Sequence, residues 1–410
     1  MKNTNGQYEI GNISVTGLVE KYGSPLYIYD TATINRQYKR LSDAFANTRM
    51  RVHFACKALN NINIMRYLCK LGAGLDAVSI QEVMMGIKAG FAPEDIMFTP
   101  NCVDFDEYDQ AIGLGVHVSI DHLSMLEKTG AKYGPNVPVS IRIKPDIMGG
   151  GHLKYSVGHV HSKFGLSTDY LPDIRRIVDA HGMRIDGLHQ HTGSDILDMD
   201  VFLKVTEVMF RAAEHFPDLQ FIDFGGGFKV PYKSDDHSTD VELLGSLLTQ
   251  RFNDFCRKYG RDLSLKFEPG KFLVSQAGFL AAKVNVVKPT ATTVFAGINT
   301  GLNHLIRPMY YDAYHHIINV SNPEGTPRMY TVVGYLCETD TFAKDREIAE
   351  ISEGDILVFF NGGAYGMTMA SNYNARPRPA EVMIHEGKDV LIRRRETLDD
   401  LLKNQIIIDL

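Results

Sequence analysis

Between about residue 50 and residue 270, hydrophobic and polar positions repeat one pattern along the chain. A short apolar or alternating run is followed by a corner containing Gly, Pro or Asp, and then by a stretch with helical period. The run RVHFACK at 51–57 has the two-residue alternation of a strand that enters a core. We predict eight such strands, at 51–57, 71–79, 95–100, 116–121, 139–145, 183–191, 219–227 and 263–270.

The segments between these strands have the amphipathic period of helices, most clearly at 198–216 and 240–260. Ser79 and Glu82 have the spacing of a capping box and predict a helix that begins after Ser79. Eight strand-then-helix units predict a parallel sheet, and eight strands can close a (β/α)8 TIM-type barrel. An open doubly wound sheet is the alternative. We favour the barrel because no GxGxxG follows the first strand.

After about residue 283 the pattern changes to strands separated by turn signals, with little helical period. Residues 380–396 have the pattern of a hairpin around Glu386–Gly387. We therefore predict a C-terminal all-β domain, to which the N-terminal segment contributes a strand near 24–30. The expected boundaries are 26–283 for the barrel, and 1–25 with 284–410 for the β domain. An irregular insertion at 146–170 is too long for an ordinary βα loop, and we expect it at the catalytic mouth.

Composition narrows the class of protein. The chain has 410 residues, is 44% hydrophobic and 22% charged, and has a formal net charge of −6. An acidic balance argues against nucleic-acid binding, and no apolar run approaches the roughly 18–20 residues of a membrane span. The polar N-terminal segment has no secretory signal pattern. Five scattered cysteines without a CxxC pair favour free thiols in a reducing cytoplasm over disulfides or a zinc site.

In a barrel of this kind the active site lies where the strands end. The glycine trio at 225–227 allows a backbone to approach an anion such as a phosphate. An amine, a phosphate site and a carboxylate in one mouth indicate pyridoxal 5′-phosphate, with an imine to a lysine and a carboxylate opposite the pyridine nitrogen. The strand ends supply Lys57, Asp76, His189, His191, Gly225–Gly227 and Glu268–Lys271.

Each of these features has an ordinary structural explanation when taken alone. A lysine at the end of a strand usually extends to water, and a glycine trio can serve close packing of a helix on a strand. His189 and His191 form an HxH pair that suits a metal, or they are bonded to nearby backbone. The sequence EPG at 268–270 is a common turn. Their joint occurrence at the strand ends of one barrel favours the cofactor site.

The chain resembles the fold-type III pyridoxal-phosphate decarboxylases, which pair an alanine-racemase-like barrel with a C-terminal β domain. The branch it resembles most decarboxylates meso-2,6-diaminopimelate to lysine. The resemblance covers about residues 24–385. The matching motifs are HFACKALNN (53–61), GLDAVSIQEV (74–83), HSKFGL (161–166), GLHQHTGSD (187–195), DFGGGF (223–228), FEPGK (267–271), GLNHLIRPMYYDAYH (301–315), CETDTFAKDRE (337–347) and GAYGMTMASNYNARPRPAEV (363–382).

The resemblance implies a role for each matching residue. Lys57 would form the imine, Cys337 would return a proton to Cα, and Glu338 would bind the substrate. In this family the last two reach into the partner's site, which implies an obligate homodimer with shared active sites. The implied cofactor contacts are Lys57, Asp76, His191 stacked on the ring, Ser194, Gly226, Gly227, Glu268, Gly270, Lys271 and Tyr365; the implied substrate contacts are Lys271, Arg307, Tyr311, Glu338 and Tyr365.

The substrate class also follows from chemistry, because a second amino-acid head needs a cation for its carboxylate and an acid for its ammonium. Arg307 and Glu338 are one of each. The family usually has arginine where this chain has Lys271, and lysine lacks the bidentate fork. Three alternatives remain: a related decarboxylase of ornithine, arginine, carboxynorspermidine or a carrier-bound amino acid; a metal-dependent barrel hydrolase; and a catalytically silent homologue.

Overall fold

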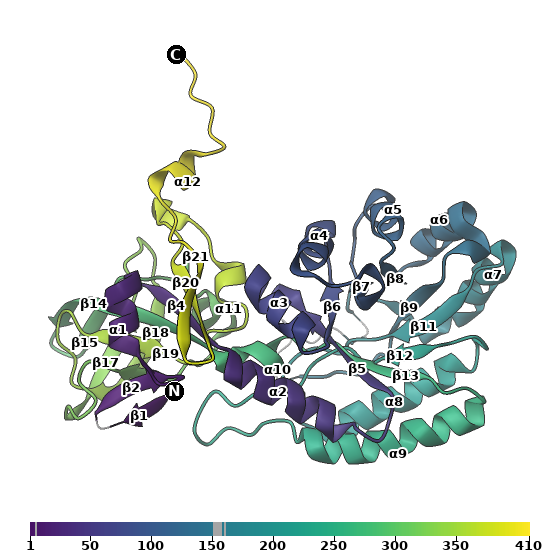
Figure 1. Cartoon of the computed structure of the whole chain (residues 1–410), viewed down its shortest axis with the longest axis horizontal. Coiled ribbons are helices and arrows are strands. Elements are labelled where there is room, and N and C mark those ends of the chain that lie inside the picture. The colour runs from purple at the N-terminus through teal and green to yellow at the C-terminus, as the bar shows by residue number, and fades with distance from the viewer. Residues whose placement is uncertain (5, 151–157, 160) are drawn as a thin grey trace. The chain divides into compact units, whose positions relative to one another are not determined.

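The computed structural model describes residues 1–4, 6–150, 158–159 and 161–410 (Figure 1). The chain forms two compact units. The barrel unit comprises 36–230 and 237–273, and the sheet unit comprises 1–35, 231–236 and 274–410. The barrel was predicted to span 26–283. The division of the structure differs at both ends, because residues 26–35 and 274–283 belong to the sheet unit.

Eight parallel strands close the barrel, in agreement with the predicted fold class. Each strand pairs with the next, and the last pairs with the first through Leu265 opposite Met50. This closure excludes the open doubly wound sheet. The strands are β5 (Met50–Ala55), β6 (Gly74–Ala77), β7 (Ile96–Phe98), β8 (His117–Ile120), β9 (Val139–Lys144), β11 (Ile185–His189), β12 (Phe221–Asp223) and β13 (Ser264–Phe267).

A helix connects each strand to the next around the barrel (Figure 1). Ser79 caps α4 as predicted, since its side chain accepts a hydrogen bond from the Glu82 N–H. In a full capping box the Glu82 carboxylate would accept the Ser79 N–H; here it accepts the Val78 N–H instead. The helices are α3 (Ile62–Lys70), α4 (Ile80–Ala89), α5 (Phe105–Gly113), α6 (Leu123–Tyr133), α7 (Leu171–His181), α8 (Met199–Ala213) and α9 (Val241–Tyr259); α2 (Thr31–Ala44) precedes β5 and α10 (Lys271–Val274) follows β13.

The alternation along β13 explains how charged residues enter the barrel. Leu265 and Phe267 are fully buried, and the Phe267 ring contacts that of Phe45 at 4.9 Å between centroids. Lys266 points the other way, with its ammonium 3.6 Å from the centroid of the Phe221 ring on β12. Glu268 follows with the same two-residue period. One face of each strand therefore packs on helices, and the other lines the interior of the barrel.

Part of the 146–170 insertion lies outside the described residues, at 151–157 and 160. Its described part contains β10 (Leu166–Ser167), which pairs with β9 in parallel. The carbonyl oxygen of Thr192 accepts a hydrogen bond from the Gly158 N–H at 3.1 Å, so this segment contacts the loop after β11.

The sheet unit is built on β4 (Leu26–Asp30), the strand expected near 24–30. This strand pairs with β14 (Gly278–Pro289) and β20 (Ala380–His385), and its inner face joins an apolar core that includes Leu26 and Ile28. The predicted hairpin joins β20 to β21 (Lys388–Arg393) through Glu386 and Gly387, both with positive φ. The other strands are β1 (Lys2–Thr4), β2 (Gln7–Ile10), β3 (Ile13–Ser14), β15 (Val294–Ile298), β16 (Ile317–Asn319), β17 (Pro327–Val333), β18 (Thr341–Ala349) and β19 (Ile356–Phe359), with helices α1 (Val15–Tyr22), α11 (Arg307–Tyr311) and α12 (Leu398–Leu402).

The strand β18 is difficult to recognise from the sequence because its middle is charged and irregular. Residues 344–347 read KDRE, and Asp345 has a φ of +46° beside a register shift in the pairing with β17. Such a bulge interrupts the two-residue period by which a strand is recognised.

Among the described residues, no helix is long and apolar enough to cross a membrane.

Candidate active site

Lys57 follows β5 directly, in a short 3-10 turn at Cys56–Ala58. Its ammonium lies 3.0 Å from Oδ2 of Asp76, at the end of β6. The Asp76 side chain is fully buried, and its Oδ1 accepts a hydrogen bond from the Thr99 hydroxyl at 2.5 Å. A strand-end lysine that simply extended to water would have no buried carboxylate beneath it. The fold therefore holds this amine at the mouth of the barrel.

Glu268 follows β13 directly, and only one of its two carboxyl oxygens has a hydrogen-bond partner among the described residues. Its Oε2 is 3.2 Å from Nε2 of His189, and both side chains are almost fully buried. Its Oε1 is buried and has no hydrogen-bond partner among the residues that the structure describes. Burial and the nearby Asp76 carboxylate raise the pKa of Glu268 to about 8, against the opposing effect of Lys57 and Arg142. This buried oxygen is placed to accept a hydrogen bond from a bound group.

The two histidines of HQH have different partners. His189 is held by Glu268 on one side and by the Ser119 hydroxyl, 3.1 Å from Nδ1, on the other. Burial lowers the pKa of His189 to about 4, so the ring is neutral at pH 7. Nδ1 of His191 accepts the Gly226 N–H at 3.2 Å, and burial with the Lys57 charge holds its pKa well below the ordinary value. His191 is therefore a neutral imidazole beside the glycine turn.

The glycine trio after β12 forms a turn that only bare backbone fits. Gly225 and Gly227 have φ of +64° and +111°. A Cβ on Gly226 would lie 2.6 Å from the Glu268 carbonyl oxygen, and one on Gly227 would lie 2.8 Å from that of Gly193. The loop that carries Ser194 is tied to this turn, because the Ile196 N–H donates to the Gly227 carbonyl at 2.8 Å. Loops after β11 and β12 thus form one cradle of the kind that binds phosphate.

The turn after β13 brings Gly270 and Lys271 to the same end of the barrel. A Cβ on Gly270 would lie 3.0 Å from the Ala58 Cβ, so the EPG turn packs against the 3-10 turn of Lys57. The Lys271 ammonium lies 2.6 Å from Oδ1 of Asp195, and its side chain is 7% exposed. In the structure this ammonium is thus paired with the loop after β11, and the contacts of Lys271 with cofactor and substrate stay predictions.

Sequence reasoning missed two charged residues of this site, Arg142 and Asp223. Arg142 on β9 is buried, and its guanidinium lies 4.7 Å from the centroid of the Phe164 ring. Asp223 is fully buried, and its Oδ1 accepts the Gly225 N–H at 2.8 Å, which holds the start of the glycine turn. Burial and Glu268 raise the pKa of Asp223 to about 8. The sequence did carry a signal for both residues, because each is a charged residue within a largely apolar strand, where a buried charge needs a reason.

The remaining predicted residues lie in the sheet unit. Arg307 begins α11 and is buried, with Nη1 donating to the Tyr232 hydroxyl at 2.7 Å. Tyr311 ends the same helix, and Tyr365 has a left-handed backbone with φ of +57°. Cys337 and Glu338 are both exposed.

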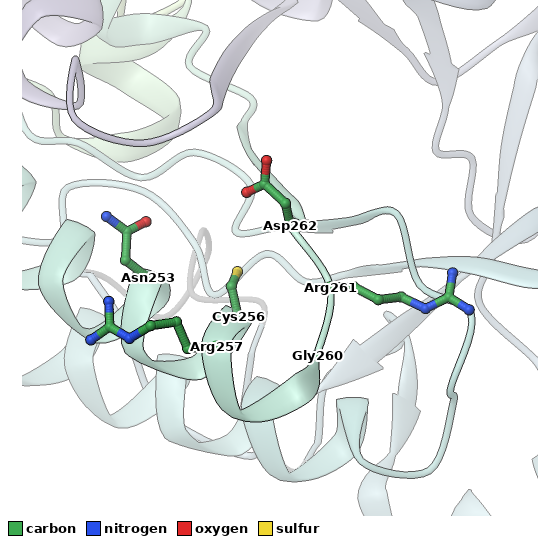
Figure 2. Close-up of a pocket in the computed structure, with 6 residues that line it drawn as sticks. All are labelled: Asn253, Cys256, Arg257, Gly260, Arg261 and Asp262. Atoms are coloured by element: carbon green, nitrogen blue, oxygen red, sulfur yellow. The ribbon is translucent and has the colours of Figure 1, made fainter.

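A surface hollow of about 420 Å³ lies elsewhere in the barrel unit, at the end of α9 (Figure 2). Asp262 lines it and precedes β13, so the hollow lies near the amino ends of the strands, opposite the catalytic mouth. Burial raises the pKa of the Cys256 thiol, which lowers its reactivity at neutral pH. None of the predicted site residues lines this hollow.

The residues at the barrel mouth fit one class of cofactor. A tethered amine, a buried carboxyl oxygen without a partner, a neutral imidazole and a glycine cradle are what a phosphorylated pyridine aldehyde requires. Fold and site together define a barrel-type pyridoxal-phosphate enzyme. Within the described residues, no group of three or more His, Cys, Asp or Glu side chains could hold a metal ion.

Comparison with known proteins gives the family. Residues 31–275 match the family model described as pyridoxal-dependent decarboxylase, pyridoxal binding domain. The chain is 38% identical to diaminopimelate decarboxylase of Methanothermobacter thermautotrophicus, covering 98% of this chain and 96% of that one. For the Escherichia coli K12 enzyme of the same name, identity is 34% over 95% and 96% of the two chains. The chain belongs to the diaminopimelate decarboxylases, within the pyridoxal-dependent decarboxylase family.

Solved structures agree with this assignment. Diaminopimelate decarboxylase from M. jannaschii, crystallised with L-lysine, has a TM-score of 0.91 at 32% identity and covers 99% of this chain and 98% of its own. A lysine/ornithine decarboxylase from Vibrio vulnificus, at 21% identity and a TM-score of 0.78, shows the shared fold alone. Membership of a pyridoxal-dependent family removes the metal-dependent hydrolase from the alternatives.

Proposed function

We propose that the protein converts meso-2,6-diaminopimelate to L-lysine and CO₂ with pyridoxal 5′-phosphate as cofactor. The observation that carries this proposal is the unpartnered Oε1 of Glu268, buried at the same barrel mouth as the Lys57 amine. When bound, the cofactor supplies a protonated pyridine ring that accepts the electrons left by CO₂. A solved relative carries L-lysine, the product of this reaction.

The barrel residues hold and tune the cofactor. Lys57 would bind it covalently through its amine, and Asp76 would keep that amine in place. Glu268 would accept the ring N–H with its Oε1 and balance its charge, and His191 would lie against the ring. Ser194, Gly226 and Gly227, together with the turn of Gly270 and Lys271, would hold the phosphate. Support comes from the distances and the tight glycine contacts at the mouth.

Residues of the sheet unit bind the substrate. Arg307 and Tyr311 receive the distal carboxylate, and Glu338 receives the distal ammonium, so that opposite charges select a second amino-acid head. Tyr365 serves cofactor and substrate. Cys337 gives its thiol proton to the carbon that lost CO₂. Burial of Arg307 supports its assignment, because a desolvated guanidinium binds a carboxylate more strongly than an exposed one.

We further propose a homodimer in which each chain supplies Cys337 and Glu338 to its partner's site. The support is that both residues are exposed on the single chain, whereas a donor to carbon must work away from water. Mixing the inactive variants Lys57→Gln and Cys337→Ala would then restore about a quarter of the sites, since random exchange leaves one intact site per mixed dimer. No recovery after subunit exchange would contradict shared sites.

We place the protein in the cytoplasm; its five cysteines are unpaired, as expected in a reducing compartment.

The decisive experiment supplies meso-diaminopimelate and cofactor to the purified protein and measures lysine and CO₂. Ornithine, arginine and carboxynorspermidine serve as competing substrates. They are needed because this chain has Lys271, paired with Asp195, where the family usually has arginine. Borohydride should fix the cofactor on the Lys57 peptide. Turnover of another amino acid in preference to diaminopimelate, or label on another lysine, would overturn the assignment.

A further inference from the structure

The thiol of Cys337 lies in a small hydrogen-bonded cluster of the sheet unit. Cys337 and Glu338 lie between β17 and β18, and Tyr373 and Asn374 lie in a 3-10 turn at Tyr373–Ala375. Nδ2 of Asn374 donates to the sulfur at 3.0 Å, while its Oδ1 accepts the Cys337 N–H at 3.1 Å. One asparagine thus holds both the backbone and the sulfur of the cysteine.

Tyr373 joins this thiol to the neighbouring carboxylate. Its hydroxyl lies 3.6 Å from the sulfur of Cys337 and donates to Oε1 of Glu338 at 2.8 Å. A phenol has a single proton to donate, so it serves either the carboxylate or a thiolate, but not both. The two groups that the proposed reaction needs in this unit are therefore coupled through one hydroxyl.

We propose that Tyr373 and Asn374 are positioning residues for Cys337, which hold its sulfur and stabilise it once its proton has left. This inference rests on the proposed function, in which the thiol proton passes to carbon. The S–H bond breaks, a Cα–H bond forms, and the electron pair of the S–H bond stays on sulfur. The Tyr373 O–H then turns from Glu338 to the thiolate and keeps its own proton.

The chemistry of proton donation explains why this arrangement helps. A donor works best when its pKa lies near the working pH, and an ordinary thiol is too weak an acid. The hydrogen bonds from Tyr373 and then Asn374 lower the pKa of Cys337, while the Glu338 charge opposes them. A substrate ammonium bound to Glu338 would offset that charge and release the Tyr373 hydroxyl to the sulfur. The thiol is then most acidic when substrate is present.

Alkylation of the full-length protein by iodoacetamide tests the inference without any turnover. Only the thiolate reacts, so the rate for the Cys337 peptide, followed by mass spectrometry between pH 5.5 and 10, reports its ionisation. In Tyr373→Phe we expect the rate at pH 7 to fall roughly fivefold or more, with the midpoint of the profile shifted to higher pH. Exposed Cys102 in the barrel unit is an internal control. Tyr170→Phe, at an exposed tyrosine, should leave the Cys337 profile unchanged.

A second variant guards against disturbance of the turn. Asn374 has a left-handed φ of +55°, which aspartate tolerates, so Asn374→Asp keeps the acceptor for the Cys337 N–H and loses the donor to sulfur. It should move the profile in the same direction. A Cys337 profile unchanged in both variants, or an altered plateau with an unchanged midpoint, would overturn the inference. Because the readout needs no substrate, this failure differs from failure to form lysine.

Discussion

Replacing Glu268 by glutamine should make the cofactor-free protein more stable at alkaline pH and the enzyme far less active. Glu268 is buried beside Asp76, which raises its pKa from 4.5 to about 8. A group whose pKa is raised by folding contributes its full stability below the unfolded value, here 4.5. That contribution is lost as the pH rises towards 8, because the folded protein retains a proton that the unfolded chain has released.

The size of the effect follows from this window. Each pH unit between the two pKa values lowers the free energy of unfolding by about 1.4 kcal/mol. Between pH 5 and pH 8 the wild-type protein should therefore lose on the order of 2–4 kcal/mol of this free energy relative to Glu268→Gln. The amide has the same shape and no charge to desolvate. It also cannot balance a protonated ring nitrogen, so we expect kcat to fall about 10²–10³-fold.

Urea unfolding of cofactor-free protein at pH 5.0 and 8.0 measures this difference. Circular dichroism is the suitable probe, since the chain has no tryptophan. Glu94→Gln, at an exposed position of the barrel unit, is the matched control and should show no pH-dependent gain. An equal stability difference at both pH values, or a Glu268→Gln protein less stable than wild type at pH 8.0, would refute the reasoning.

Three further predictions concern the same barrel mouth. Lys57→Gln should lower activity at least ~10³-fold and abolish borohydride trapping, because the amine that binds the cofactor is gone; trapping that persists would contradict this. Gly226→Ala should cost about 1–3 kcal/mol of stability and weaken cofactor binding, as the new Cβ would lie 2.6 Å from a carbonyl oxygen, whereas Gly113→Ala meets no atom within 4 Å. Lys271→Met should cost about 2–4 kcal/mol in chemical denaturation because it strands the Asp195 carboxylate, while Lys132→Met, at an ion pair on the surface, should leave the stability nearly unchanged.

Local pattern was enough to predict the elements of the barrel. Strands and helices have different hydrophobic periods, and each depends on residues a few positions apart, so eight strands and the hairpin at Glu386–Gly387 were readable from the chain. The same reading placed Lys57 and Glu268 at strand ends. The pattern is much harder to read at β18, where a bulge and four consecutive charged residues interrupt the two-residue period.

The chemistry of those residues was decided by tertiary structure. The barrel closes only when β13 pairs with β5. That closure buries Glu268, leaves its Oε1 without a partner among the described residues, and raises its pKa. Desolvation depends on everything that surrounds a group, and most of those neighbours are distant in sequence. The pairing of Lys271 with Asp195 has the same origin. The sequence by itself determined which side chains reach the mouth of the barrel; burial and distant neighbours decided which of them are charged, paired or available.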